Sequence, residues 1–600
     1  MSDVKALRQL SPLRNTTNAS DPEKLASEQL AHFGVNPDSA YGAALLDFAT
    51  RLYALNGDAD AICKTTAEHL GTLDRSDRIA WFNAKRFICF QLAKVLDTLQ
   101  NPMRASYQSL VTGHPGFAVK GPYPLFDNVT ALFSATPVIT RTATYLFACT
   151  EWVEDAFTGR EPLHEIYSRL LNPTSISLAN HIVDLECGHE ANRYLAWNYN
   201  SGMAAIDGLL SHLVGYEDII LSSRNVYGGT YQLLHDWYGK PGNLNVAIEW
   251  FDGFDGVAFD AALKAAEQKY ADRIAKGRRI YVYVESPCNP HGNVLDVAAI
   301  SRIAHEHGWT VACDTTVGTP FLYPVLKHKD EIARPDYVIH SYTKEMTGGG
   351  ATTAGVVIGK AERMFMPKGD SLSVTKYDGS EETINWDETM FWNVYYVKGA
   401  FLDSDKAYEV LNGLKTYELR VVHKAVNTLT LANALNAHPK INVNCPAIET
   451  HPNHQTFRST MKNAMPAGLF TIDMEEVDKD AFKRFFDSLE PALGLQVSLG
   501  QTNSLALCPG LTSHSELSAE AQKEAGIAPT TIRLSVGLED PRRLLAHMKE
   551  AAKSTIDPVH PGFSEQFLSA KDLDALYRST YTSVHNRFIE SQPDAESFEA

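Results

Sequence analysis

The chain has 600 residues, of which 44% are hydrophobic and 21% are charged, so it contains ample apolar material for a buried core. This composition excludes a disordered or fibrous protein. The formal net charge is −18, which argues against non-specific nucleic-acid binding. No apolar stretch approaches the roughly 20 residues that span a bilayer, so we expect no membrane segment.

The eight cysteines are scattered and form no CxxC pair, and the first twenty residues lack the apolar segment of a secretory signal. We therefore expect reduced cysteines, no zinc site and a cytoplasmic protein. His305-Glu306-His307 lies at a predicted helix end. We interpret it as a solvated terminus and not as a metal site.

The first 120 residues or so have helical periodicity. Asp21-Pro22 predicts the start of a helix and Gly34 its end. A second helix is expected near 76–100, where apolar residues recur at three- and four-residue steps. The segment 113–124 is rich in Gly and Pro, which predicts a linker.

From about residue 139 to 400 the pattern alternates between strands and helices. Four short runs rich in Val, Ile and Tyr predict strands at 218–221, 279–285, 310–313 and 337–340. Asp296 and Gly308 bound a helix between the middle two runs. This spacing predicts a parallel sheet in an α/β fold. The polar, aromatic-rich stretch 361–400 is an insertion that the pattern does not assign.

A smaller α/β unit is expected from about residue 413. It contains a helix at 416–439, a strand at 531–536, a helix that begins at Asp540-Pro541 and a last helix near 572–590. The predicted organisation is a helical extension (1–120), an arm (121–180), a large domain (181–410, with the insertion 361–400), a C-terminal α/β domain (411–556) and a helical tail (557–600).

Polar, aromatic and glycine residues follow the predicted strands. In an open parallel sheet, ligands bind beyond the carboxyl ends of the strands. The groups that follow the strands are Tyr227-Gly228-Gly229-Thr230, Ser286-Pro287-Cys288-Asn289-Pro290, Asp314-Thr315-Thr316 and Ser341-Tyr342-Thr343-Lys344, and Ser201-Gly202-Met203 opens an apolar helix upstream.

This set meets the needs of pyridoxal 5'-phosphate. The aldehyde of that cofactor requires a lysine, and its pyridine nitrogen requires a carboxylate. Its phosphate requires hydroxyls and free backbone N–H groups at a helix start, and an aromatic ring can stack on its face. The available groups are Lys344, Asp314, Ser341, Thr343, Tyr227 and the helix start at Gly202-Met203.

With these motifs in family order, the chain resembles the Cys/Met-metabolism family of pyridoxal-phosphate enzymes, which includes cystathionine γ-synthase, cystathionine γ-lyase, methionine γ-lyase and O-acetylhomoserine sulfhydrylase. The resemblance runs from about Thr136 to Met548. It implies the fold-type-I architecture, with a mainly parallel sheet in the large domain. It is also carried by Tyr167-Ser168-Arg169, Asn172-Pro173-Thr174, Gly413-Leu414-Lys415-Thr416, Ser498-Leu499-Gly500 and the run from Arg533 to Asp540.

The resemblance implies a role for each matching residue. Lys344 is expected to be the Schiff-base lysine and proton carrier, Asp314 the partner of the pyridine nitrogen, and Tyr227 the stacking ring and an acid or base. The phosphate is expected to be bound by Gly202, Met203, Ser341 and Thr343, and the ring hydroxyl by Asn289.

The resemblance also implies a substrate clamp and an assembly. Arg533 is expected to bind the substrate α-carboxylate with the help of Ser498. Tyr167 and Arg169 are expected to reach the phosphate in a neighbouring subunit. The protein is then a homodimer or homotetramer whose active sites are shared, and 121–180 is the arm that completes the neighbouring site.

The resemblance implies γ-replacement or α,γ-elimination on an amino acid with a leaving group on Cγ. Two alternatives remain open, namely a specialised γ-synthase or lyase with a non-thiol nucleophile or unusual amino acid, and a catalytically retired scaffold. Several of the departures from the family pattern are expected near the substrate side of the site. They are Thr315 in place of Asn, Glu345 in place of an aromatic residue, Gly348-Gly349 in place of Gly-His, Cys508-Pro509 in place of His-Pro, and Gly229 in place of the cysteine of methionine γ-lyases.

Overall fold

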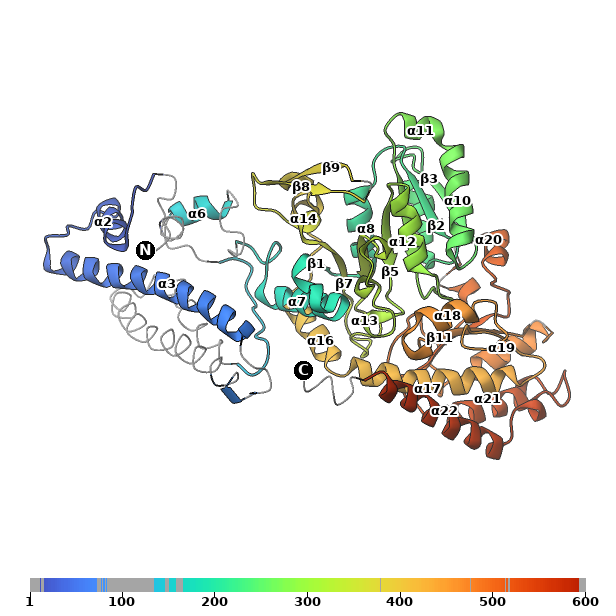
Figure 1. The fold of residues 1–600 in the computed structure, drawn as a ribbon. Coiled ribbons are helices and arrows are strands. Elements are labelled where there is room, and N and C mark those ends of the chain that lie inside the picture. Colours follow the sequence, from blue (N-terminus) through green and yellow to red (C-terminus); the bar gives the residue numbers. More distant parts are fainter. Residues whose placement is uncertain are drawn as a thin grey trace, which may run out of the picture. The chain divides into compact units, whose positions relative to one another are not determined.

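The computed structural model describes residues 11, 16–72, 77, 79, 80, 83, 134–145, 150–157 and 166–592, except 378, 475, 513, 516 and 517. The chain forms two compact units (Figure 1). One comprises Met1–Val138, Tyr145–Ile166 and Pro593–Ala600, and the other comprises Ile139–Thr144 and Tyr167–Gln592. The linker expected at 113–124, and nearly all of the helix expected near 76–100, lie outside the described residues.

The described part of the first unit is helical. α2 (Pro22–His32) starts where it was predicted to, because the Asp21 carboxylate accepts a hydrogen bond from Lys24 N at 2.9 Å. Gly34 follows it with a positive φ of 69°. The other helices are α3 (Ala40–Thr72), which the periodicity did not single out, and α6 (Thr150–Phe157). Leu25 of α2 is fully buried and packs with Tyr53 of α3.

A seven-stranded sheet forms the centre of the second unit. Its order is β1-β7-β6-β5-β4-β2-β3, and only β7 runs antiparallel to its neighbours. The strands are β1 (Tyr194–Tyr199), β2 (Ile219–Ser223), β3 (Ala247–Phe251), β4 (Ile280–Glu285), β5 (Thr310–Asp314), β6 (Tyr337–His340) and β7 (Gly355–Lys360). The four predicted strands are confirmed to within two residues. Every residue of β4 is buried, as the apolar run requires.

Helices connect the strands and cover the sheet. They are α7 (Pro173–Cys187), α8 (Gly202–Leu213), α9 (Gly228–Gln232), α10 (Gly256–Lys269), α11 (Ala271–Ala275), α12 (Val297–Glu306), α13 (Thr319–Leu322) and α14 (Ala361–Met364). The predicted helix between β4 and β5 is α12, and the Asp296 carboxylate caps it by accepting from Ala299 N at 3.0 Å. α7, α10 and α12 share one hydrophobic core with the sheet. These elements confirm the predicted α/β class.

The C-terminal part has its own antiparallel sheet, in the order β10-β11-β13-β12. Its strands are β10 (Asn442–Asn444), β11 (Leu469–Asp473), β12 (Leu505–Leu507) and β13 (Ile532–Ser535). The short α15 (Tyr396–Lys398) belongs to the insertion. The helices that follow it are α16 (Ser404–Leu414), α17 (Tyr417–Asn436), α18 (His454–Thr460), α19 (Lys479–Asp487), α20 (Ala519–Glu524), α21 (Pro541–Thr555) and α22 (Ala570–Glu590). The long α17 lies beside α22 (Figure 1). It also contributes to both hydrophobic cores, with Val421 in one and Leu431 in the other.

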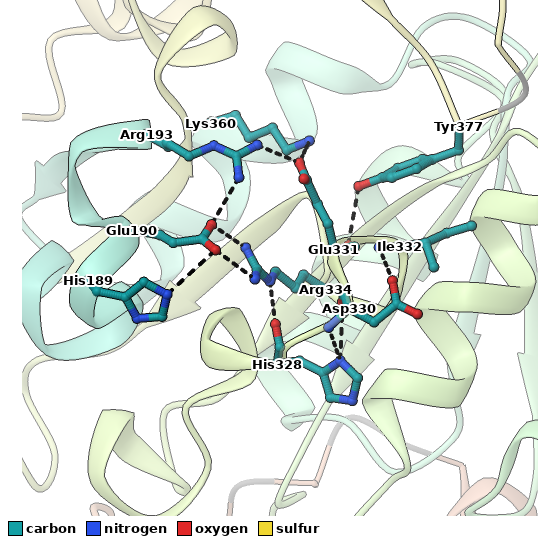
Figure 2. Close-up of polar contacts among 10 residues, drawn as sticks. All are labelled: His189, Glu190, Arg193, His328, Asp330, Glu331, Ile332, Arg334, Lys360 and Tyr377. Atoms are coloured by element: carbon teal, nitrogen blue, oxygen red, sulfur yellow. Dashed lines mark hydrogen bonds and ion pairs between the residues drawn. The ribbon is translucent and has the colours of Figure 1, made fainter.

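The insertion that the sequence pattern left unassigned forms a hairpin, β8 (Ser371–Thr375) and β9 (Glu381–Asn385), followed by an aromatic segment. Figure 2 shows how the hairpin joins the large sheet: the Tyr377 hydroxyl donates to the Glu331 carbonyl at 3.3 Å. The Glu331 carboxylate accepts from Lys360 at 2.7 Å and from Arg193 at 2.8 Å. This network lies at the edge where β6 begins, opposite the edge that carries the predicted site.

The hairpin also overturns the interpretation of His305 as part of a solvated helix end. His305 is buried, and its ring nitrogens contact the Ile332 carbonyl at 2.7 Å and the Asp336 carboxylate at 3.0 Å. The ring of Tyr377 stacks on it with the ring centroids 4.7 Å apart. His305 is therefore covered by residues 332–336 and by a segment 72 residues further along the chain, which helix periodicity cannot reveal.

Candidate active site

Ten of the twelve predicted site residues line one cavity of about 220 Å³ at the carboxyl ends of β4, β5 and β6. Loops of the C-terminal part close its other side. The ten are Gly202, Met203, Tyr227, Asn289, Asp314, Ser341, Thr343, Lys344, Ser498 and Arg533. The remaining lining residues include Ser201, Ile206, Glu285, Thr316, Val317, Thr353, Val497 and Leu499. The topology thus brings together residues that lie up to 332 positions apart, from Ser201 to Arg533.

Lys344 stands in the turn that follows β6. Its Nζ lies 3.4 Å from Ser498 Oγ, and no carboxylate of a described residue lies within ion-pair distance of it. Burial, and after it the nearby positive charge of Arg533, together lower the pKa of this amine to about 8. A substantial part of the amine is therefore neutral near pH 8, as a nucleophile or a base requires.

Two buried carboxyl groups face the cavity. Asp314 ends β5, and its in-register neighbour Glu285 ends β4. The Glu285 carboxylate accepts from the backbone N–H groups of Tyr227 at 2.7 Å and Asn289 at 2.8 Å. Burial raises the pKa of both carboxyl groups, and the charge of Asp314 raises that of Glu285 further.

Glu285 was not among the predicted site residues, although it opens the motif that contains Asn289. Besides its place in that motif, its sequence signal is its position at the end of a buried strand. In the structure it fixes the backbone of Tyr227, whose ring is expected to stack on the cofactor, and the backbone of Asn289. The register of β4 and β5 places Glu285 beside Asp314 and so identifies it as a residue of the site.

The start of α8 forms the opposite wall of the cavity. Ser201 caps this helix by accepting from Ala204 N at 3.1 Å. A Cβ atom at Gly202 would lie only 2.7 Å from Ser341 Cβ, so glycine is needed for the helix start to approach the turn after β6. The Thr343 hydroxyl exchanges hydrogen bonds with the backbone of Ala354, at 3.0 and 3.2 Å. The helix start is a ready anion site with a positive dipole end.

Arg533, on β13, is a buried guanidinium that pairs with no carboxylate among the described residues. Its Nη1 donates to Asn289 Oδ1 at 2.8 Å and its Nη2 donates to the Ser498 carbonyl. Its Nε is buried and has no hydrogen-bond partner. Burial lowers the pKa of the group to about 10. An unpaired buried cation of this kind is suited to a carboxylate ligand.

Comparison with known proteins agrees with this geometry. A family profile described as "Cys/Met metabolism PLP-dependent enzyme" matches residues 127–553. The chain belongs to this family. L-methionine γ-lyase of Pseudomonas putida is 31% identical over 442 residues, covering 74% of this chain and 98% of that protein. O-acetyl-L-homoserine sulfhydrylase of Leptospira meyeri is 30% identical, covering 69% and 91%.

Solved structures share the fold of this family member. A putative O-acetylhomoserine (thiol)-lyase from Campylobacter jejuni, solved with N'-pyridoxyl-lysine-5'-monophosphate, is 27% identical with a TM-score of 0.58. The match covers 70% of this chain and 96% of that one. Cystathionine γ-synthase from Xanthomonas oryzae is 23% identical with a TM-score of 0.56, which shows a common fold.

The cavity of this family member fits pyridoxal phosphate by its donor set. It offers a lysine free of carboxylates, a buried carboxylate in Asp314 without a cationic partner among the described side chains, and a helix start whose glycine leaves space beside Ser341. The described residues hold no cluster of three or more His, Cys, Asp or Glu side chains that could bind a metal.

Tyr167 and Arg169 do not line the cavity of their own chain. Arg169 lies over the Tyr167 ring, with 5.4 Å between its Cζ and the ring centroid, and its Nη1 donates to the Tyr396 carbonyl at 2.8 Å. A Cβ atom at Gly399 would lie 2.7 Å from Arg169 Cδ. The aromatic segment of the insertion therefore holds this pair in place, and 40% of Tyr167 is exposed.

The departures from the family pattern do not line the cavity, although several were expected near its substrate side. Its lining residues include none of Gly229, Thr315, Glu345, Gly348, Gly349, Cys508 and Pro509. Glu345 turns away from Lys344 and forms a buried ion pair with Lys424, 2.7 Å long. Successive residues of a tight turn point in different directions, so adjacency to the lysine in sequence did not mean adjacency to the substrate.

In the cofactor-free protein, we expect the Lys344 amine to titrate with a midpoint near pH 8, well below the 10.5 of an ordinary lysine. Burial and Arg533 penalise the charged form, so the proton leaves at a lower pH. Reactivity toward an electrophile should therefore rise as the pH rises through about 8 and should be small below it. Competitive acetylation followed by mass spectrometry measures this midpoint.

The variant Arg533→Met is the control for this titration. Removal of the guanidinium removes one of the two causes of the lowered pKa, so the midpoint should move upward. A midpoint at the ordinary lysine value in the unmodified protein would contradict the burial of Lys344, and an unchanged midpoint in the variant would contradict the influence of Arg533.

Proposed function

We propose that this protein catalyses γ-replacement or α,γ-elimination on an amino acid that carries a leaving group on Cγ. The observation that carries this proposal is the shared cavity of Lys344, whose amine has a lowered pKa, and Arg533, whose guanidinium has no carboxylate partner among the described residues. The names of the relatives, a methionine γ-lyase and an O-acetylhomoserine sulfhydrylase, support the same reaction class.

We infer the following placement of the cofactor. The amine of Lys344 would attach to its aldehyde, the carboxylate of Asp314 would keep its pyridine nitrogen protonated, and the Tyr227 ring would stack on its face. The start of α8, with Ser341 and Thr343, would hold its phosphate. When bound, the cofactor supplies an electron sink for the bonds at the substrate Cα.

Residues of the chain would then bind the substrate and move protons. Arg533 would hold the α-carboxylate through two parallel charge-assisted hydrogen bonds, with Asn289 and the Ser498 carbonyl fixing its plane. Lys344 would carry one proton at a time, first from Cα to the cofactor and then from Cβ to the leaving group on Cγ. The Ser498 hydroxyl, 3.4 Å from Nζ, would orient the amine between these positions.

Gly229 bears on the same proposal through Tyr227, which lines the cavity. A Cβ atom there would lie 2.6 Å from the Tyr227 ring and 3.3 Å from Met203 Sδ. A cysteine, as methionine γ-lyases have at this place, would displace Tyr227 from its present position. The Tyr-Gly-Gly-Thr form thus favours substrates of the cystathionine synthase and lyase branches.

Product analysis tests the proposal. The purified protein would be offered cystathionine, methionine and O-acyl-homoserines, with and without a thiol, and the products identified by mass spectrometry. We expect turnover of a Cγ substrate, giving either a thioether or a 2-oxo acid with ammonia. Turnover of cysteine alone, by β-elimination, would contradict the γ assignment.

The same experiment separates the alternatives. A product formed from an O-acyl-homoserine only with a non-thiol nucleophile would identify a specialised γ-synthase. A purified protein that lacks the visible absorbance of a lysine-bound cofactor, and whose spectrum borohydride does not change, would be a retired scaffold. The retention of Lys344, Asp314 and Arg533 in one cavity argues against that outcome.

We further propose a cytoplasmic homodimer or homotetramer in which Tyr167 and Arg169 complete the site of a neighbouring subunit. Both residues lie outside the cavity of their own chain, and part of Tyr167 is exposed. Each of the five cysteines whose side chains are described is buried and free, as reducing surroundings would allow. The arm 121–180 would carry the shared residues, the domains 181–410 and 411–556 would form the site, and 1–120 and 557–600 would be helical additions.

Mixing two inactive variants tests the sharing of sites. Arg169→Ala and Lys344→Ala, each inactive alone, would be unfolded together and refolded. In a shared dimer, half of the molecules are mixed and each has one intact site, so about a quarter of the normal activity should return. Mixtures of separately folded variants that cannot exchange subunits should stay inactive. No recovery after joint refolding would place Arg169 in the site of its own chain.

A further inference from the structure

A buried ion pair lies directly behind Lys344. Glu345 Oε2 and Lys424 Nζ are 2.7 Å apart, and only 7% and 1% of these side chains are exposed. Neither residue lines the cavity. Glu345 belongs to the turn after β6 of the large sheet, and Lys424 belongs to α17, the helix that joins the two hydrophobic cores.

A second cation of α17 holds the same turn. Arg420 lies one helical turn before Lys424, and its guanidinium donates to the carbonyls of Glu345 at 2.7 Å, Met346 at 3.1 Å and Gly413 at 2.8 Å. Gly348 has a positive φ of 67°, and a side chain there would collide with Arg420. Residues of α17 therefore contact the backbone that follows Lys344 at several points.

The substrate clamp rests on the other side of this ion pair. A Cβ atom at Gly468 would lie 3.5 Å from Glu345 Oε1 and 3.6 Å from Lys424 Cδ. The Gly468 carbonyl accepts from Val536 N at 2.8 Å, one residue past the end of β13 and three residues after Arg533. The ion pair thus lies beside Gly468, whose backbone is hydrogen-bonded to the segment that directly follows the strand of Arg533.

The loop that carries Ser498 also packs against this turn. Gly500 has a positive φ of 76°, and a Cβ atom there would lie 2.6 Å from Glu345 N and 2.8 Å from Lys344 C. Ser498 itself contacts Lys344 Nζ and accepts from Arg533. Lys344, Ser498 and Arg533 are therefore connected through the buried turn that contains Glu345.

The chemistry of the pair also points to positioning. The attraction within a buried ion pair often fails to offset the free energy that is lost when its two charges leave water. A protein with well-packed apolar residues of similar volume in its place is often as stable or more stable. What an ion pair adds is direction, because it permits only one relative placement of the two groups. Here one group belongs to the turn that carries Lys344. The other belongs to α17, whose Asn427 donates to the carbonyls of Gly537 and Glu539 at 3.0 Å, just past the strand that carries Arg533.

We propose that Glu345 and Lys424 are positioning residues that hold the carboxylate-binding Arg533 at its working distance from Lys344. The inference rests on the proposed function, because it assigns the α-carboxylate to Arg533. Neither residue touches substrate or cofactor. Loss of the pair loosens the placement of Arg533 and Ser498 while the cavity keeps all of its side chains.

The test compares binding of L-alanine and L-alaninamide to the holoenzyme. The two probes differ only in the carboxylate, so the ratio of their dissociation constants, read from the visible absorbance, reports on Arg533. The main variant is Glu345→Leu/Lys424→Met, which replaces the ion pair by an apolar pair. The matched control is Glu190→Leu/Arg334→Met, which removes a largely buried ion pair, 2.6 Å long, at the opposite edge of the sheet (Figure 2).

We expect the main variant to lose the preference for L-alanine by about tenfold to a hundredfold, since a displacement of about 1 Å has effects of this order. Its melting temperature should stay close to that of the unmodified protein, and the control should keep the full preference. A main variant with the normal ratio would overturn the proposal. An equal loss in both variants would overturn it as well, since the effect would then be general.

Two further measurements keep the result decisive. If the main variant does not fold, Glu345→Asp keeps the charge and shortens the reach by one methylene, and a normal ratio in that variant would also refute the positioning role. If the unmodified protein itself shows no preference for L-alanine, the carboxylate assignment of Arg533 fails. That failure belongs to the proposed function and is thereby distinguished from failure of the positioning role.

Discussion

Lys344→Ala should lower kcat on a Cγ substrate by about 10⁴-fold or more, because the variant loses both the covalent attachment of the cofactor and the base that moves the protons. Lys344 Nζ lies within 3.4 Å of Ser498 Oγ and no other lysine lines the cavity in the described part of the chain, so no neighbour can replace it. Steady-state kinetics and the visible absorbance of the lysine-bound cofactor measure the two losses separately.

The control for this variant is Lys264→Ala. Lys264 lies on the surface of α10, where it pairs with Asp260 at 2.6 Å, and an exposed pair of this kind contributes little to stability. Its removal should leave both the activity and the absorbance unchanged. If Lys344→Ala kept the absorbance of a lysine-bound cofactor, another lysine would have to be the point of attachment.

Arg533→Met should lower kcat/KM by about 10³-fold, since a charge-assisted hydrogen bond to a buried ligand contributes roughly 1.5–3 kcal/mol and two are lost. The melting temperature should be unchanged or higher. Burial lowers the pKa of this guanidinium to about 10, so the folded protein bears a cost for keeping it charged, and methionine removes that cost. Kinetics and thermal unfolding of the same preparation measure the two effects.

Arg533→Lys serves as the conservative companion. Lysine keeps the charge but cannot make two parallel hydrogen bonds, so its kcat/KM should fall between those of the other two proteins. A loss of activity in Arg533→Met that is matched by a loss of thermal stability would assign the residue a structural role. An unchanged KM for the amino-acid substrate would contradict its role as the carboxylate clamp.

Local signals predicted the regular elements well. β6 has the predicted bounds, and β4 and β5 differ from theirs by one residue, because a short apolar run buried on both faces has little freedom in its length. α12 and α21 begin where Asp296 and Asp540 cap them. The hairpin in the insertion also had a local signal, Asp378-Gly379 between two alternating runs, which the sequence interpretation did not use.

The content of the cavity could be predicted for a related reason. Side chains that follow parallel strands meet at one edge of the sheet, so Asp314, Lys344 and Asn289 come together once the strands are known. Arg533 and Ser498 were assigned only through the family resemblance, since Arg533 comes from the other sheet and Ser498 from a loop of the C-terminal part. For them, no periodicity or spacing in the sequence predicts a shared cavity.

By itself, the sequence of this protein predicted four strands of the large sheet and the capped helix starts, because caps and apolar runs act over a few residues. It also placed several of the residues around Lys344 at strand ends. Only the tertiary structure decided the pairing of Glu285 with Asp314, the hydrogen bond between Asn289 and Arg533, and the ion pair of Glu345 with Lys424. Such contacts join residues 29 to 244 positions apart. They depend on sheet register and on the packing of α17, which no local pattern encodes.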